Sequence, residues 1–375
     1  MISGSNPLFT PRPEGPVPAE PAREHGGGLD RAAVRYGIPR ERWIDLSTGI
    51  NPVCYPLPVL PPALWQLLPD AALEERLRAA AASYYGVPDP RLVVPAPGSQ
   101  ALIQWLPRIE APSQMTVSQM TVSRVAVLGP TYNEHAPAWA AAGHAVVEVD
   151  GLDAIPGDAA VVVVVNPNNP DGRLVEPRRL LELTERRLVV VDEAFADVVP
   201  AVSVARWAGR PNLVVLRSVG KFFGLAGLRL GFALAERKRA LALEAALGPW
   251  SVSGPAAAIG AAALADDAWI TETRARLAGA AARLDALVAG SGIAIVGGTP
   301  LFRLLVHPDA DRLFDRLAQS GILTRRFAAC PRWLRVGLPA GESEWARLAE
   351  ALADWQEKPR KTRQHYPASE QPFRT

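Results

Sequence analysis

The chain has 375 residues, of which 49% are apolar, and its 40 basic and 38 acidic side chains give a net charge of +2. This size and composition predict a soluble globular protein with two domains, and the balanced charge argues against a nucleic-acid or membrane-surface partner. Because Cys54 and Cys330 are the only cysteines and lie far apart, we expect no disulfide framework and a cytoplasmic location.

The two ends of the chain differ in composition from the rest. Residues 1–24 are rich in Pro and Gly and begin without the basic and apolar regions of a signal peptide, so a mobile arm is expected. Residues 357–375 are polar and basic, which predicts a disordered tail. The longest apolar strand runs are far too short to span a bilayer.

Between these ends, helical and strand patterns alternate. Residues 71–85 predict an amphipathic helix that ends at Gly86. Seven short apolar runs predict strands, at residues 91–94, 124–128, 145–149, 161–165, 188–191, 213–216 and 229–233. Continuous Val and Leu runs bounded by turns are typical of strands covered on both faces, so the fold class is α/β, with a mainly parallel sheet between helices.

After residue 248 the pattern changes. Residues 256–288 are helical in pattern, and two strands are expected around 301–306 and 333–337. This pattern predicts a smaller α+β domain. We therefore expect residues 55–247 to form the large domain, 248–356 the small domain, and 25–54 a segment that joins the small domain and the site.

Lys221 is the most informative residue of the chain. It is one of only four lysines and follows the apolar run 213–216, among glycines and phenylalanines. Burial at such a position disfavours the ammonium and leaves a nucleophilic amine. Asp192 ends the apolar run 188–191, where ligands bind in open α/β sheets, although an aspartate there could also cap a helix.

Five polar residues follow one another in a specific order: Asn169, Asp192, Ser218, Lys221 and Arg229. Their order and spacing resemble the aspartate-aminotransferase-like superfamily of pyridoxal phosphate (PLP) enzymes. The resemblance implies PLP as cofactor, with Lys221 as its covalent attachment point and Asp192 facing the pyridine nitrogen. It implies Ser218 and Arg229 as ligands of the cofactor phosphate, for which a guanidinium is well suited.

Three further positions fit this resemblance. The turn Gly98-Ser99-Gln100 follows a predicted strand and opens a helix, where backbone N–H groups would bind the same phosphate. Tyr132 matches the aromatic residue that stacks on the cofactor, and Asn169 would hydrogen-bond its phenolic oxygen. Two positions depart from the superfamily, since Phe195 and Leu68 replace tyrosines that contact the phenolic oxygen and the neighbouring subunit's phosphate.

The N-terminal flank narrows the resemblance. His25-Gly-Gly-Gly28 and Asp45-Leu-Ser-Thr-Gly49-Ile-Asn-Pro52 resemble threonine-phosphate decarboxylases of cobalamin biosynthesis, and the match runs from about residue 24 to about residue 355. These enzymes are close to histidinol-phosphate aminotransferases. The resemblance implies a phosphorylated amino acid as substrate, bound by His25, Gly26, Gly49 and Asn169. Gly49 replaces a common asparagine, so only backbone contact is expected there.

Two arginines complete the implied substrate site. Arg325 would clamp the substrate phosphate, with Arg326 left open as an alternative, and Arg335 would bind the α-carboxylate. Orientation by two arginines selects which bond at the α-carbon is cleaved. The runner-up is therefore a histidinol-phosphate or related aminotransferase, and a distant alternative is a non-catalytic PLP-fold regulatory protein. The resemblance also implies a homodimer, and no metal site is expected.

Overall fold

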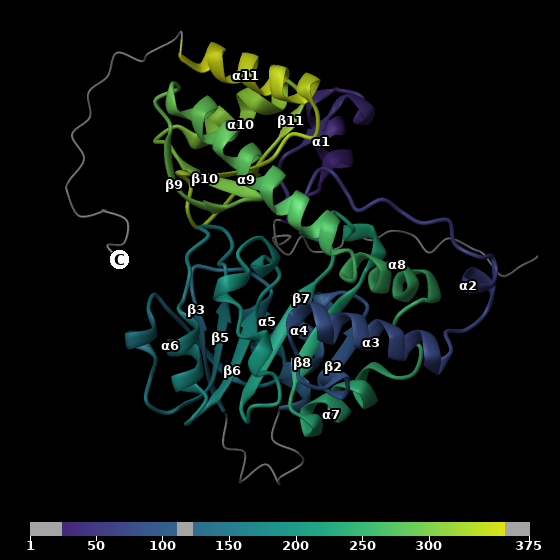
Figure 1. Cartoon of the computed structure of the whole chain (residues 1–375). Coiled ribbons are helices and arrows are strands. Elements are labelled where there is room, and N and C mark those ends of the chain that lie inside the picture. Colours follow the sequence, from purple (N-terminus) through teal and green to yellow (C-terminus); the bar gives the residue numbers. More distant parts are fainter. Residues whose placement is uncertain (1–24, 111–122, 357–375) are drawn as a thin grey trace, which may run out of the picture.

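The computed structural model of the protein describes residues 25–110 and 123–356. The arm and the tail expected at the two ends lie outside these ranges. Figure 1 shows a large lobe around one sheet, drawn below, and a smaller lobe above it. Within the described ranges, no helix combines the length and apolar character that crossing a membrane requires.

Seven strands of the described chain form the sheet of the large lobe, in the order β2-β8-β7-β6-β5-β3-β4. They are β2 (Val93–Ala96), β3 (Arg124–Leu128), β4 (Ala145–Val149), β5 (Ala159–Val165), β6 (Leu188–Asp192), β7 (Leu213–Ser218) and β8 (Gly231–Ala235). Neighbouring strands pair in parallel, apart from β8, which runs antiparallel to β2 and β7. The expected mainly parallel sheet is confirmed.

Two strands begin later than the sequence predicted. Residues 90–92 form a 3₁₀ turn, in which the Asp89 side chain accepts from the Arg91 N–H, so β2 starts only at Val93. Arg229 ends another 3₁₀ turn with a left-handed backbone, φ 54°, so β8 starts at Gly231. Both shifts have a local cause, because a turn precedes each strand.

Alternate side chains of the sheet enter two separate cores. Val127, Val163 and Val190 pack on one face with residues of α4 (Ser99–Ile109), α5 (His135–Ala141) and α7 (Arg237–Leu247). Leu128, Val164 and Val191 face the other core. That core includes residues of α3 (Ala71–Tyr85), α6 (Pro177–Leu183) and α8 (Gly254–Leu264). Burial on both faces explains why the strands have continuous Val runs.

The long helical pattern predicted for residues 256–288 is two helices. A break at Ala265–Asp266 separates α8 from α9 (Asp267–Ala289), because the Asp266 side chain accepts from the Trp269 N–H and caps the second helix. Helix α8 packs against α3 of the large lobe. The division of the chain into domains at residue 248 stays a prediction.

The small lobe has an antiparallel sheet, with four strands in the described chain in the order β12-β13-β10-β9. They are β9 (Ala294–Thr299), β10 (Phe302–Val306), β12 (Arg325–Arg326) and β13 (Trp333–Gly337), and helices α10 (Ala310–Gln319) and α11 (Glu342–Gln356) accompany them. The sequence did not predict β9, whose apolar run is interrupted by Gly297 and Gly298.

The N-terminal segment belongs to the small lobe. Helix α1 (Leu29–Tyr36) contacts α10, and β1 (Ile44–Asp45) pairs in parallel with β11 (Ile322–Leu323). The chain then passes through the short helix α2 (Ala63–Gln66), at the right of Figure 1, before it enters α3. Segments far apart in sequence therefore meet where the two lobes face each other.

Candidate functional site

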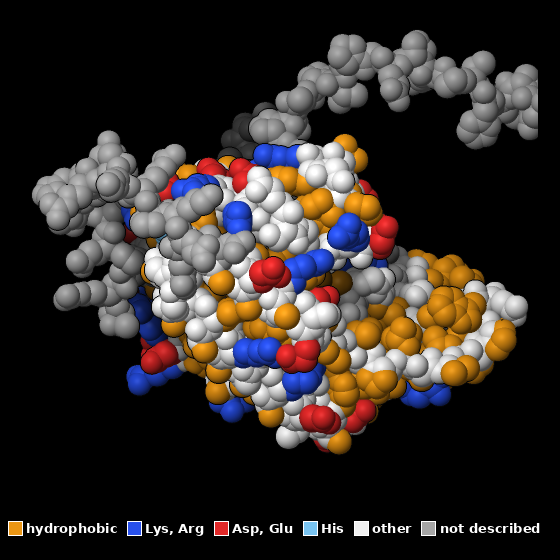
Figure 2. Space-filling view, turned by 90° about the horizontal axis from the view of Figure 1, so that it is seen from above, with side chains coloured by type: hydrophobic (Ala, Val, Ile, Leu, Met, Phe, Trp, Pro, Cys, Tyr) orange, Lys and Arg blue, Asp and Glu red, His pale blue; other side chains and the backbone are white. Residues whose placement is uncertain are grey.

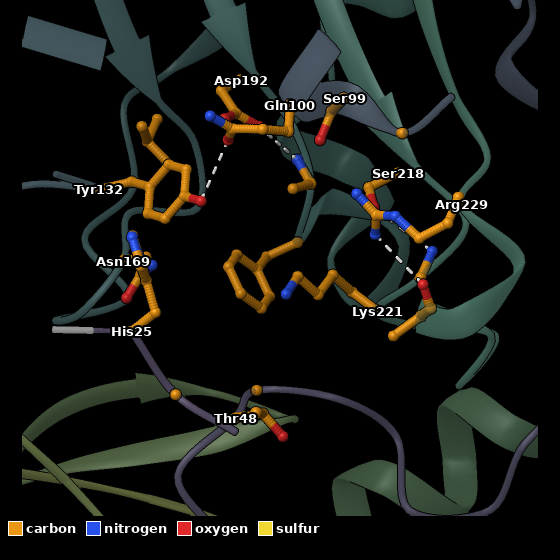
Figure 3. A pocket seen from close by; sticks show the side chains of 18 of the residues that line it. His25, Thr48, Ser99, Gln100, Tyr132, Asn169, Asp192, Ser218, Lys221 and Arg229 are labelled. Carbon is orange, nitrogen blue, oxygen red and sulfur yellow. Dashed lines mark hydrogen bonds between the residues drawn. The ribbon is translucent and has the colours of Figure 1, made fainter. Parts of the chain in front are cut away.

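A cavity of 220 Å³ lies between the lobes, at the carboxyl edge of the parallel strands. Every candidate site residue predicted from the sequence lines it: His25, Gly26, Gly49, Gly98, Ser99, Gln100, Tyr132, Asn169, Asp192, Ser218, Lys221, Arg229, Arg325 and Arg335. Figure 3 shows Lys221 pointing into the middle of this cavity. Ser99, Ser218 and Arg229 lie at one end, and Tyr132, Asn169 and His25 lie at the other.

The parallel strands explain this convergence. Asp192 and Ser218 are the last residues of β6 and β7, and Asn169 lies in the turn after β5. Tyr132 follows β3 by a short turn. Because parallel strands end at the same edge of a sheet, residues distant in sequence are brought to one side of it.

At one end of the cavity, helix α4 begins close to Arg229. Gly98 precedes the helix with φ 83°, and a Cβ atom there would lie 2.8 Å from Nη2 of Arg229. A Cβ atom on Gly231 would lie 2.5 Å from the backbone N of Ser99. Glycine is therefore required at both positions. With the hydroxyls of Ser99 and Ser218 nearby, this end of the cavity offers several donors to an anion.

Lys221 is a buried amine that points into the cavity (Figure 3). Burial and then the positive charge of Arg335 lower its pKa to about 8, against the opposing charge of Asp192. The amine of Lys221 lies 5.7 Å from the centre of the Phe195 ring. A lysine with this pKa is partly in the free-amine form near neutral pH, which is the form that attacks a carbonyl.

Asp192 is held by a partner that the sequence analysis missed. Its Oδ2 lies 2.9 Å from Nε2 of His135, and its Oδ1 accepts from the Ala194 N–H at 3.0 Å. Both side chains are buried, since His135 is 1% exposed and Asp192 is 4% exposed. The only signal in the sequence is that His135 lies three residues after Tyr132, which does not identify Asp192 as its partner.

Arg335 is a buried cation that lines the cavity. It donates to Oδ1 of Asn169 at 2.5 Å and to the backbone O of Ser47 at 2.8 Å, and both acceptors are uncharged. Its Nε has no hydrogen-bond partner within the described chain. Burial and the charge of Arg325 lower the pKa of Arg335 to about 9. The guanidinium is therefore suited to receive an anionic group.

Arg325 and Arg326 have different positions. Arg325 lines the central cavity and also a neighbouring outer cavity of 320 Å³, whereas Arg326 lines only the outer one. Arg326 also lies 3.2 Å from the carboxylate of Asp311. The outer cavity has further basic side chains, Arg31 and Arg35, and none of its lining residues in the described chain is acidic. A phosphate near Arg325 would therefore enter through positively charged surroundings.

The two departures from the superfamily lie in different places. Phe195 lines the cavity, and a Cβ atom on Gly49 would lie 2.9 Å from its ring and 2.8 Å from that of Phe302. Gly49 therefore makes room for the two phenylalanines. Leu68 does not line the cavity and is 65% exposed. Among the described residues, no group of three or more His, Cys, Asp or Glu side chains could hold a metal ion.

Comparison with known proteins gives consistent matches. The family model for class I and II aminotransferases matches residues 64–352. A threonine-phosphate decarboxylase of Sinorhizobium sp is 47% identical over 341 residues, which cover 88% of this chain and 97% of that protein. A threonine-phosphate decarboxylase of Pseudomonas aeruginosa is also 47% identical, over 89% of this chain and 98% of that protein.

Among solved structures, the fold is similar to that of histidinol-phosphate aminotransferase from Sinorhizobium meliloti in complex with pyridoxal 5'-phosphate. The TM-score is 0.73 at 22% identity, and the match covers 88% of this chain and 94% of that one. This similarity shows the shared fold.

Proposed function

The chain belongs to the class I and II aminotransferase family, and within it to the threonine-phosphate decarboxylases. From this premise we propose that it is a PLP-dependent carboxy-lyase, which converts L-threonine O-3-phosphate to (R)-1-amino-2-propanol O-2-phosphate in cobalamin biosynthesis. The observation that supports the choice of substrate best is Arg335, a buried cation that has no acidic hydrogen-bond partner among the described residues and lies in the same cavity as Lys221.

The cavity fits the groups of the cofactor. A phosphate can occupy the end near Ser99, Ser218 and Arg229, where Gly98 leaves the helix start open. The buried carboxylate of Asp192 would hold a proton on the pyridine nitrogen. Lys221 supplies an amine of lowered pKa for the aldehyde. Tyr132 offers its ring for stacking and Asn169 an amide for the phenolic oxygen, while Phe195 supplies no hydroxyl.

The rest of the cavity fits the substrate. Arg335 would pair with the α-carboxylate, and Asn169 lies beside it. Arg325 and His25 line both cavities and would bind the phosphate, with the backbone of Gly26 and Gly49 close by. Arg325 is favoured over Arg326, because Arg326 lines only the outer cavity and is near the Asp311 carboxylate. Two charged anchors on one small molecule fix its orientation.

The chain's own residues would then select and complete the reaction. When bound, PLP supplies an electron-poor ring that takes up the electron pair of a bond broken at the substrate α-carbon. Arg335 and Arg325 hold the two anionic groups so that the bond to the carboxylate, and not the C–H bond, is the one presented for cleavage. Loss of CO₂ leaves the α-carbon one proton short, and the protonated amine of Lys221 or a bound water would deliver that proton.

We expect two copies of the chain to form the enzyme. The segment around α2 exposes apolar side chains, with Trp65 69%, Leu67 69% and Val59 99% exposed. Figure 2 shows it as a projection, at the right, covered mainly by apolar side chains. Such a surface on a soluble protein marks an association site. A second copy is the proposed occupant, and sedimentation of a Trp65→Ser, Leu67→Ser variant should show monomers where the wild type shows dimers.

The reaction is tested with PLP-loaded protein and threonine phosphate, with and without 2-oxoglutarate. We expect equal amounts of CO₂ and aminopropanol phosphate, identified by mass, with no need for 2-oxoglutarate. The Lys221→Ala variant should bind PLP without covalent attachment and release no CO₂. Transfer of the amino group to 2-oxoglutarate without CO₂ release would instead favour the aminotransferase.

A further inference from the structure

Glu134 is a buried acid that contacts two residues of the cavity wall, and the proposed mechanism does not use it. It immediately precedes α5 in the large lobe and is 8% exposed. Its two carboxylate oxygens contact different side chains. Oε1 lies 3.1 Å from Nε2 of His25, and Oε2 accepts from Nε2 of Gln100 at 3.2 Å. One carboxylate therefore joins two residues of the cavity wall.

The contact with His25 crosses from one lobe to the other. The backbone around His25 is attached to the small lobe, since the Gly27 N–H donates to Oγ of Ser47 at 2.7 Å. Ser47 itself follows β1 and donates to Asp45 at 2.5 Å. A Cβ atom on Gly26 would lie 2.5 Å from the backbone O of Ser47, so the segment packs tightly on the residues that follow β1. Glu134 thus holds the N-terminal segment from the opposite lobe.

The contact with Gln100 continues to Tyr132. The hydroxyl of Tyr132 donates to Oε1 of Gln100 at 3.2 Å, and Figure 3 marks this bond. Because a carboxylate only accepts, the amide nitrogen of Gln100 must face Glu134 and its oxygen must face Tyr132. Burial and the charge of Glu134 raise the pKa of Tyr132 to about 12, so the hydroxyl keeps the proton that it donates. Glu134 therefore sets the direction of both hydrogen bonds.

We propose that Glu134 is a positioning residue that couples two events at the site: the docking of the N-terminal segment through His25, and the orientation of the Tyr132 ring through Gln100. When the segment leaves, Glu134 loses its contact with His25, and Gln100 and Tyr132 lose the alignment that this contact supports. The proposal rests on the proposed function only through the cofactor on which Tyr132 stacks.

The test compares Glu134→Gln with Glu148→Gln, a matched change at an exposed glutamate of the same lobe that lines none of the described cavities. The first readout is hydrogen exchange of residues 25–36 in protein without cofactor. Glu134→Gln should speed this exchange by about twofold to fivefold, as expected for weakening one half-exposed contact to a carboxylate. Glu148→Gln should leave it unchanged.

The second readout is the visible circular dichroism of bound PLP without substrate, which reports the asymmetric contacts of its ring. Glu134→Gln should change it, and the same substitution in a Tyr132→Phe background should add nothing. With substrate, Glu134→Gln should raise KM by about twofold to tenfold and alter kcat less, the size of one or two hydrogen bonds. The two substrate-free readouts do not depend on which reaction the enzyme catalyses.

Should Glu134→Gln make the protein too unstable to measure, His25→Asn tests the same coupling at the more exposed partner of the contact. This variant should change the dichroism of bound PLP in the same direction, and the double variant should equal the stronger single one. Fully additive effects, or a Glu134→Gln protein that behaves as Glu148→Gln does in both substrate-free readouts, would overturn the proposal.

Discussion

Two arginines of this protein are equally buried, with 3% of Arg217 and 2% of Arg335 exposed, yet their surroundings are opposite. Arg217 donates to Oε2 of Glu193 at 2.6 Å and also pairs with Asp197. Burial alone would lower its pKa, but the charges of Asp197 and its neighbours raise it instead. Arg335 has uncharged acceptors, and its pKa is lowered to about 9.

The alternation of side chains along strands explains how the two arise. Asp192 and Ser218 line the cavity. Their chain neighbours Glu193 and Arg217 therefore point to the opposite side, where the two form an ion pair. The guanidinium of Arg217 also lies over the ring of Tyr85, 4.3 Å from its centre. The charge of Arg217 is therefore balanced by carboxylates of the chain, whereas Arg335 has no acidic hydrogen-bond partner among the described residues. Arg217 stabilises the strand ends, and Arg335 is the arginine that we propose to bind substrate.

The largest effect on stability should come from removing Arg217 from its ion pairs with Glu193 and Asp197. Arg217→Met leaves two buried carboxylates without a cation, so the free energy of unfolding should fall by about 3–5 kcal/mol. Urea denaturation measures it. Adding Glu193→Gln and Asp197→Asn should restore much of the loss, because no unpaired charge then remains. A greater loss of stability in Arg335→Gln than in Arg217→Met would reverse the comparison.

Arg335→Gln should instead affect activity. Losing the partner of a bound carboxylate costs about 2–5 kcal/mol, which corresponds to a fall in kcat/KM of about thirtyfold or more. The free energy of unfolding should stay within about 1 kcal/mol of the wild type, since the hydrogen bonds of the removed guanidinium go to the uncharged acceptors Asn169 and Ser47. Steady-state kinetics measures kcat/KM, and urea denaturation of the same preparation measures the free energy of unfolding. Near-normal kcat/KM would remove Arg335 from the substrate site.

A smaller effect concerns the pKa of Lys221. The positive charge of Arg335 is, after burial, the main cause that lowers this pKa to about 8. Arg335→Gln should therefore raise it, and the free amine should form at higher pH. The rate of covalent PLP uptake by protein without cofactor, which needs the free amine, should have its midpoint near pH 8 in the wild type and higher in the variant. A midpoint that falls or does not move would contradict this electrostatic coupling.

Much of the fold could be predicted from the sequence, because the Val runs of β3, β5, β6 and β7 have the length and turn boundaries of buried parallel strands. The candidate site residues also converge on one cavity, because most of them lie at strand ends or helix starts. The break between α8 and α9 could not be predicted, since one capping aspartate ends an otherwise continuous helical pattern.

The side-chain contacts that support the site could not be predicted from the sequence. Nothing in the spacing of His135, Glu134 or Arg217 indicates that they meet Asp192, His25 and Glu193, because these contacts depend on side-chain directions across two lobes or two strands. The same holds for Gly49, whose lack of a Cβ atom is explained only when Phe195 and Phe302 are seen beside it.

The central claim is that Arg335 receives the carboxylate that the reaction removes. It is tested most directly by comparing substrate and product on PLP-loaded wild type and Arg335→Gln. The product, aminopropanol phosphate, lacks the carboxylate, so its inhibition constant should change by less than about threefold, within the size of a weak contact. The kcat/KM for threonine phosphate should fall by about thirtyfold or more. Equal weakening of substrate and product would contradict the account.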